Sequence, residues 1–154
     1  MRAILILMTF LSSLLLAQEL RIKANSFSAD ELKGVSVFNG DVNIVKEQDE
    51  LNASTVTIYT DKKNQPIKFV AVGNVSFKIE TKTKAIYEGK ANRVIFLPQE
   101  KEYHFYENVH LKQLNEKKEI QGNEVILNIN DGKAHAKGLK EGPVIMIFDI
   151  EEEK

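Results

Sequence analysis

Apolar and polar residues alternate along most of the chain from Glu19 onward. Apolar side chains recur at every second position, as in Val42 and Ile44 or in Val75 and Phe77. Successive side chains of a β-strand point to opposite faces, so residues two apart line one face. Because no stretch shows a convincing 3.6-residue period, the pattern predicts an all-β domain.

Residues that favour turns separate the alternating segments, and short strands joined in this way form an antiparallel meander. One stretch, Ser26 to Leu32, resembles a capped turn more than a strand, and we expect a short helix or an irregular segment there. The expected turns are Asn39–Gly40, 61–66, Gly73–Asn74, Pro98–Gln99, Asn115–Glu116 and Asp131–Gly132.

A pattern of small and apolar residues repeats along the chain. One element spans residues 38–44 and returns at 71–77 and 105–111, which are 33 and then 34 residues further on. The third copy departs from the others, with Asn108 where they have glycine. A second element interleaves with the first, at residues 52–58, 90–96 and 121–127. Such periods are typical of stacked units whose faces are buried by their neighbours.

At these residues the chain resembles the OstA-like family of periplasmic lipopolysaccharide-transport proteins. The resemblance covers about residues 20–137 and is carried by residues 37–42, 51–53, 71–75 and 85–91. It implies an open, twisted antiparallel β-jelly roll in which two sheets enclose an apolar groove. The implied function is carriage of the acyl chains of lipid A.

The inward positions of the strands are the candidate wall of that groove. A methylene exposed to water costs about 0.8 kcal/mol, so a carrier of acyl chains needs a continuous apolar surface. Without the resemblance, the same alternation favours a closed core, as in a periplasmic structural or assembly protein that binds no lipid. The expected lipid-binding residues are Val42, Ile44, Val56, Ile58, Val75, Phe77, Val94, Phe96, Val109, Leu111, Val125 and Leu127.

The first seventeen residues are typical of a signal peptide, with Arg2 preceding an apolar stretch from Ile4 to Leu16. Thirteen helical residues span about 20 Å, which is less than the roughly 30 Å of a bilayer core. We therefore expect cleavage near Ala17, leaving one OstA-like domain over residues 18–154 in the periplasm. An uncleaved N-terminus would instead indicate an inner-membrane-anchored partner from the same pathway.

The charged and reactive residues of the chain exclude several further classes of function. Lysine and arginine total 21 against 22 for aspartate and glutamate, with no basic stripe for nucleic acid. The three histidines, His104, His110 and His135, lack metal-ligand spacing, although the first two could meet across a hairpin. The chain contains no cysteine and no motif of a hydrolase or a phosphate-binding loop. We expect no catalysis, metal or cofactor.

Both ends of the domain look suited to pairing with other chains. Residues 20–24 alternate as an edge strand does, and residues 143–150 are a nearly uninterrupted apolar run. Such a run is typical of a fully covered strand or of an edge that awaits a partner. By the resemblance, the expected partners are lipopolysaccharide, inner- and outer-membrane transport components, and further copies of the chain arranged head to tail.

Overall fold

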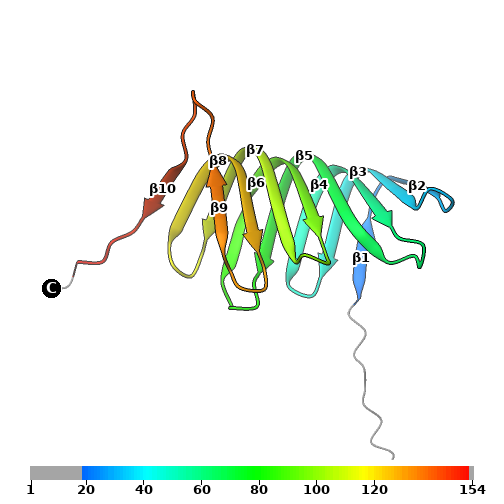
Figure 1. The fold of residues 1–154 in the computed structure, drawn as a ribbon, viewed down its shortest axis with the longest axis horizontal. Helices are drawn as coiled ribbons and strands as arrows, with labels where there is room; N and C mark the ends of the chain where they lie inside the picture. The colour runs from blue at the N-terminus through cyan, green and yellow to red at the C-terminus, as the bar shows by residue number, and fades with distance from the viewer. Residues whose placement is uncertain (1–18, 153–154) are drawn as a thin grey trace, which may run out of the picture.

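A computed structural model describes residues 19–152, which form ten β-strands in one antiparallel sheet (Figure 1). The sheet order is β1-β3-β4-β5-β6-β7-β8-β10, with β2 also paired to β3 and β9 to β8. The predicted all-β class is confirmed. The strands are β1 Leu20–Lys23, β2 Ser26–Asp30, β3 Val35–Lys46, β4 Asp49–Thr60, β5 Pro66–Glu80, β6 Ile86–Leu97, β7 Glu102–Gln113, β8 Lys118–Asn128, β9 Ala134–Lys137 and β10 Ile145–Phe148.

The predicted signal peptide, residues 1–17, lies outside the described residues. Within residues 19–152, the structure contains no helix long and apolar enough to cross a membrane.

The long strands β3 to β8 are interrupted midway by a line of register shifts. In β3, β5 and β7 the shift follows Asn39, Val72 and Tyr106, respectively. At each place two consecutive residues adopt a left-handed φ: residues 40–41, 73–74 and 107–108. Two residues of one strand thus lie opposite one residue of its neighbour, which is a β-bulge that bends the strand. These bulges form a crease that crosses the sheet.

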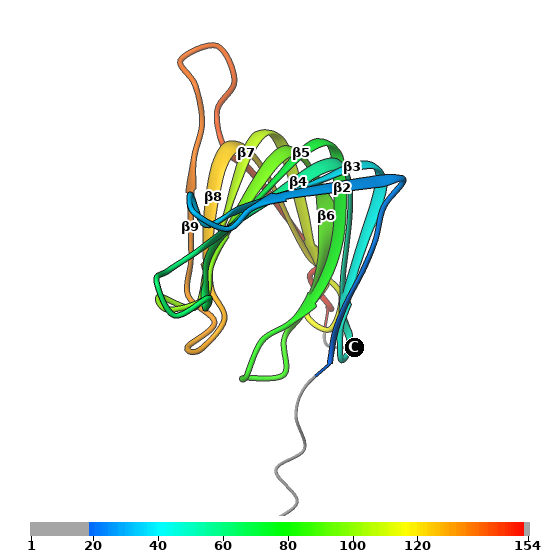
Figure 2. The same ribbon diagram turned by 90° about the vertical axis from the view of Figure 1, so that its right-hand side faces the viewer.

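The crease folds the sheet into an arch of two layers (Figure 2). Layer A contains β2, β9 and the strand segments 35–39, 55–59, 66–72, 93–97, 102–106 and 124–128. Layer B contains β1, β10 and the segments 42–46, 49–53, 75–80, 86–91, 109–113 and 118–122. Seen along its length, the arch is closed at the crease and opens at the opposite side, where the hairpins lie.

Two of the predicted turns are wrong, because Asn39–Gly40 and Gly73–Asn74 belong to the crease and the strand continues through them. The glycines are needed there: a Cβ on Gly40 or Gly73 would lie 2.5 Å from Asn25 Nδ2 or 2.6 Å from Ser54 Oγ. In the third repeat, Glu107 rather than Asn108 takes the glycine position. The other predicted turns are confirmed, and the sequence analysis missed those at residues 47–48 and 81–85.

The helical or irregular stretch predicted at Ser26 to Leu32 is also wrong. Residues 26–30 form strand β2, and only residues 31–34 turn. The strand pairs with β3 from Ser26–Asn39 to Asp30–Val35, and the rings of Phe27 and Phe38 lie 4.9 Å apart. Pairing with the sheet therefore overrides the local preference for a capped turn.

Candidate functional site

The inward faces of the two layers enclose one apolar interior, and part of it is open. A hollow of about 500 Å³ lies in the half of the arch nearer the N-terminal strands. Its wall comes from both layers: Ile44 and Leu51 from layer B, and Phe69 and Phe96 from layer A. These four side chains are only half-buried, so an apolar surface faces solvent through the mouth of the arch.

The structure places four of the twelve predicted lipid-binding residues on the wall of this hollow. They are Ile44, Val56, Val94 and Phe96. The other eight belong to the same interior but are packed and almost inaccessible. These eight are Val42, Ile58, Val75, Phe77, Val109, Leu111, Val125 and Leu127, none more than 7% exposed.

An aromatic contact joins the two layers in the middle of the interior. Phe77 of layer B stacks on Phe105 of layer A, with ring centroids 4.4 Å apart. Beyond this contact, toward the C-terminal strands, Leu111, Val125 and Leu127 are at most 1% exposed. The interior is therefore a groove at its N-terminal half and a closed core at its C-terminal half.

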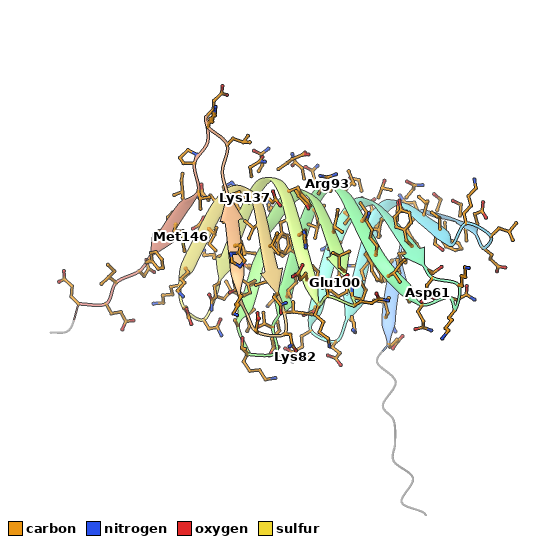
Figure 3. All side chains as sticks on the ribbon, in the orientation of Figure 1. Asp61, Lys82, Arg93, Glu100, Lys137 and Met146 are labelled. Atoms are coloured by element: carbon orange, nitrogen blue, oxygen red, sulfur yellow. The ribbon has the colours of Figure 1, made fainter. Side chains whose placement is uncertain are left out.

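The mouth of the closed half is bridged by the hairpin at residues 81–85, which we call the crossing hairpin. It leaves layer B after β5, and its Lys82 N–H donates to the carbonyl of Ile129 beyond β8 in layer A, at 2.9 Å. The Ile129 N–H in turn donates to the Lys101 carbonyl, also at 2.9 Å. Figure 3 shows Lys82 at the rim opposite Arg93 and Lys137, which lie along the crease.

Sequence reasoning missed several residues of the hollow. Leu51, Phe69 and Tyr103 line it without being among the predicted residues, as do Pro66 and Pro98. Phe69 lies two positions before Ala71, and Tyr103 two before Phe105, so the alternation itself carries the signal. The two prolines lie at or just beyond a strand end and follow no period, so only the fold brings them to the mouth.

Charged side chains lie at the mouth of the hollow. Lys46 and Asp49 of layer B both contribute to its rim. Burial raises the pKa of the Asp49 carboxyl, although its bond from the Glu80 N–H and the nearby Lys46 act in the opposite direction. Burial likewise raises the pKa of the Tyr103 phenol. An amphipathic ligand would find charge at the rim and apolar surface inside.

The outer face of layer B differs sharply from the interior. One row across its strands carries charges of alternating sign, from neighbouring positions on β4, β5, β6, β7 and β8. Opposite charges on adjacent strands stabilise such a face in water. The row consists of Glu50, Lys78, Glu88, Lys112 and Glu119.

The suggested meeting of His104 and His110 is wrong, because the crease separates them into different layers. His104 lies on layer A, where its Nε2 is 2.8 Å from Glu102 Oε2 and its Nδ1 is 3.3 Å from the Tyr106 hydroxyl. His110 lies on layer B beside Lys90. No side chain joins the two into a site.

Comparison with known proteins agrees with this geometry. A search of curated proteins gives no match. Among solved structures, the chain resembles LptH from Pseudomonas aeruginosa, the LptA-homologous periplasmic component of the lipopolysaccharide transport device. The two share 18% sequence identity, with a TM-score of 0.76 over 86% of this chain and 96% of LptH. This likeness confirms the open, twisted antiparallel fold expected from the sequence.

The sequence itself places the chain in a family. Residues 21–133 match the family described as LptA/(LptD N-terminal domain) LPS transport protein. The match runs from β1 to the turn before β9 and so includes the crease, the crossing hairpin and all of the hollow except Leu20. The chain therefore belongs to the LptA/LptD N-terminal domain family of lipopolysaccharide transport proteins.

Proposed function

We propose that this protein is a periplasmic carrier that holds the acyl chains of lipid A in the groove between its layers. The observation that carries the proposal is the apolar hollow, whose half-buried side chains Ile44, Leu51, Phe69 and Phe96 face solvent. Its volume of about 500 Å³ lies within the usual range for small-molecule sites, about 300–1,000 Å³. Each methylene that leaves water for this wall gains about 0.8 kcal/mol.

We also propose that copies of the chain join head to tail and bridge inner- and outer-membrane transport components. At the N-terminal end of the sheet, the chain runs from layer B in β1 to layer A in β2. At the C-terminal end it runs from layer A in β9 to layer B in β10. Two copies stacked in the same orientation would thus meet with antiparallel strands in both layers, continuing the pattern of the sheet.

The edge strand β10 has the exposure that such a joint requires. All four of its residues, Ile145 to Phe148, are apolar and 46–52% exposed. At the other end, Leu20 of β1 is 41% exposed. A free edge also has unpaired backbone N–H and C=O groups, which a strand from another copy can satisfy. Pairing would bury apolar surface at both edges and extend the groove from copy to copy.

Photocrosslinking tests where the acyl chains bind. A photoreactive amino acid at Phe69 or Phe96, which line the hollow, should label lipopolysaccharide, whereas one at the exposed Lys62 should not. Phe77 is a poorer position because its ring is buried against Phe105. Equal labelling at Phe96 and Lys62 would contradict the groove and favour the alternative of a structural protein that binds no lipid.

An inner-membrane-anchored partner from the same pathway is the second candidate, because the N-terminal segment is apolar. Mass spectrometry of the protein purified from its native source separates the two. A mature N-terminus near Gln18 in the soluble periplasmic fraction supports the carrier. An intact Met1 in the membrane fraction would support the anchored partner.

A further inference from the structure

The two halves of the interior differ in how they are closed. In the N-terminal half, Phe69 and Phe96 line the hollow and remain half-buried. In the C-terminal half, Phe105, Val125 and Leu127 are completely buried. A groove that delivers acyl chains to a neighbour beyond β9 and β10 must admit them to this closed half. In the structure, the packed side chains of the closed half leave no room for acyl chains.

The crossing hairpin spans the mouth of the closed half and makes few contacts with layer A. Its backbone tie is the bond from the Lys82 N–H to the Ile129 carbonyl. Beside that bond, Thr83 packs against Gly132: a Cβ on Gly132 would lie 2.9 Å from Thr83 Oγ1. A single backbone hydrogen bond contributes little net stability, because both groups bond to water when it breaks, so this tie is reversible.

The base of the hairpin, by contrast, is firmly held within layer B. Thr81 is 2% exposed, its hydroxyl accepts a bond from the Ala85 N–H at 3.1 Å, and its N–H donates to the Ala85 carbonyl at 2.9 Å. The side-chain amide of Asn115 donates to the Lys84 carbonyl at 2.8 Å and accepts from the Ile86 N–H at 3.1 Å. The hairpin can therefore leave layer A without losing its own shape.

Electrostatic repulsion opposes the closed position. Lys82 and Lys101 flank Ile129, to which both are joined through the backbone. Hydrogen bonding to Lys101 and the charge of Lys101 lower the pKa of the Lys82 ammonium. Within residues 19–152, neither lysine forms a salt bridge that would offset this repulsion. Lys82 and Lys101 thus both position the Lys82–Ile129 contact through their backbones and weaken it through the repulsion between their side chains.

We propose that the crossing hairpin is a releasable tie: acyl chains first occupy the open N-terminal half, and they reach the C-terminal half when the Lys82–Ile129 contact opens. This inference rests on the proposed carrier function. It assigns the two halves of one groove successive roles, reception and onward delivery. The physical basis is that an acyl chain entering between Phe77 and Phe105 covers the apolar surface that their separation exposes. The contacts across the mouth, which the acyl chain does not replace, are few and weak.

A disulfide across the mouth tests the tie. Because the chain contains no cysteine, the two introduced cysteines have no other thiol in the chain to pair with. The Cβ of Thr83 would lie 3.9 Å from a Cβ on Gly132, close to the disulfide average of about 3.8 Å. The Thr83→Cys/Gly132→Cys protein is incubated with lipid A that carries a diazirine on one acyl chain. After irradiation, labelled residues are mapped by mass spectrometry, and the reduced form of the same protein is the control.

With the disulfide formed, we expect labelling of Phe69 and Phe96 but only background labelling of Leu111 and Leu127. The reduced protein should show labelling in both halves. Equal labelling of the C-terminal half in the two forms would overturn the tie and leave the carrier function intact. Absence of labelling in both halves of the reduced and the wild-type protein would instead overturn the carrier function itself.

Hydrogen exchange of the wild-type protein gives a second measurement, which does not depend on a cysteine at Gly132, where φ is +72°. The Lys82 and Ile129 amides should be protected in the free protein, because both donate hydrogen bonds. Saturating lipid A should reduce the protection of Lys82 while the Ala85 amide, which belongs to the base, stays protected. Unchanged protection of Lys82 would overturn the tie.

Discussion

The carboxylate of Asp49 accepts a hydrogen bond from the backbone N–H of Glu80, with Oδ1 2.8 Å from the nitrogen. This bond joins the start of β4 to the end of β5 at the rim of the hollow, where the carboxylate is partly removed from water. Burial raises the pKa of Asp49 above its ordinary value of 3.8, so the folded protein prefers the protonated form more than the unfolded chain does. The folding stability that protonated Asp49 contributes is therefore lost as pH rises from 3.8 through the higher pKa of the folded protein.

The variant Asp49→Asn keeps an acceptor for Glu80 and removes the buried charge. We expect it to unfold at higher urea concentration than the wild type at pH 7, with the difference disappearing as pH falls below 3.8. The measurement is urea denaturation at a series of pH values. A variant less stable than the wild type at pH 7 would mean that attraction to Lys46 outweighs the cost of burial.

Phe105 is the completely buried residue on which Phe77 stacks. Its replacement by alanine should lower the free energy of unfolding by about 3–5 kcal/mol, the usual cost of removing a buried aromatic side chain. Leu32, which is fully exposed in the turn after β2, offers a control whose replacement by alanine should change stability by less than about 0.5 kcal/mol. Similar losses at both sites would contradict the contact between the layers.

Gly89 makes room for the neighbouring strand. A Cβ at this position would clash with the His110 carbonyl and lie 3.1 Å from the Phe77 ring. Gly89→Ala should therefore cost about 1–3 kcal/mol, as overpacking does, whereas Gly142→Ala meets no atom within 4 Å and should be neutral. Thermal unfolding of the two variants checks this, and a neutral Gly89→Ala would show that the strands can separate there.

Deletion of residues 144–154 removes β10, none of whose residues is buried. The truncated protein should stay folded and no longer assemble, whereas the full-length protein should form larger species as its concentration rises, because head-to-tail contacts do not close. Analytical ultracentrifugation with circular dichroism checks both. Concentration-dependent oligomers of a folded truncated protein would show that β10 is not the joint.

Lys101→Glu replaces the repulsion at the tie by attraction. We expect slower hydrogen exchange at the Lys82 amide than in the wild type, and the effect should shrink with added salt. Lys140→Glu makes the same charge change in the arm between β9 and β10 and should leave that amide unaffected. Faster exchange in the Lys101→Glu protein would indicate that Lys101 stabilises the closed hairpin.

Local alternation was enough to predict the long strands and the inward side of each, because the direction of a side chain depends on its immediate neighbours, but it did not predict β2. The crease could not be predicted from the sequence, because Gly73–Asn74 has the composition of a hairpin turn. The strand continues through these residues only because it is paired with a neighbouring strand on both sides. Glu107 and Asn108 adopt the same backbone without any glycine, so residue type alone does not identify the bulge.

The extent of the groove was equally hidden from the sequence. Phe77 and Phe96 are both aromatic residues of alternating strands, yet one is sealed against Phe105 and the other lines the hollow. The difference arises from side chains that approach from opposite layers, which a pattern along one strand does not encode. The contact between Lys82 and Ile129 joins two turns in the same way.

The position of the crease has a consequence for how such a protein can change in length. Every strand from β3 to β8 crosses it, so each pair of strands adds one complete slice of the arch, with a wall in each layer. The sequence repeats at 33 and 34 residues, which corresponds to one such pair. Duplication or loss of a repeat would thus lengthen or shorten the trough while its cross-section, and the size of chain it accepts, stayed the same.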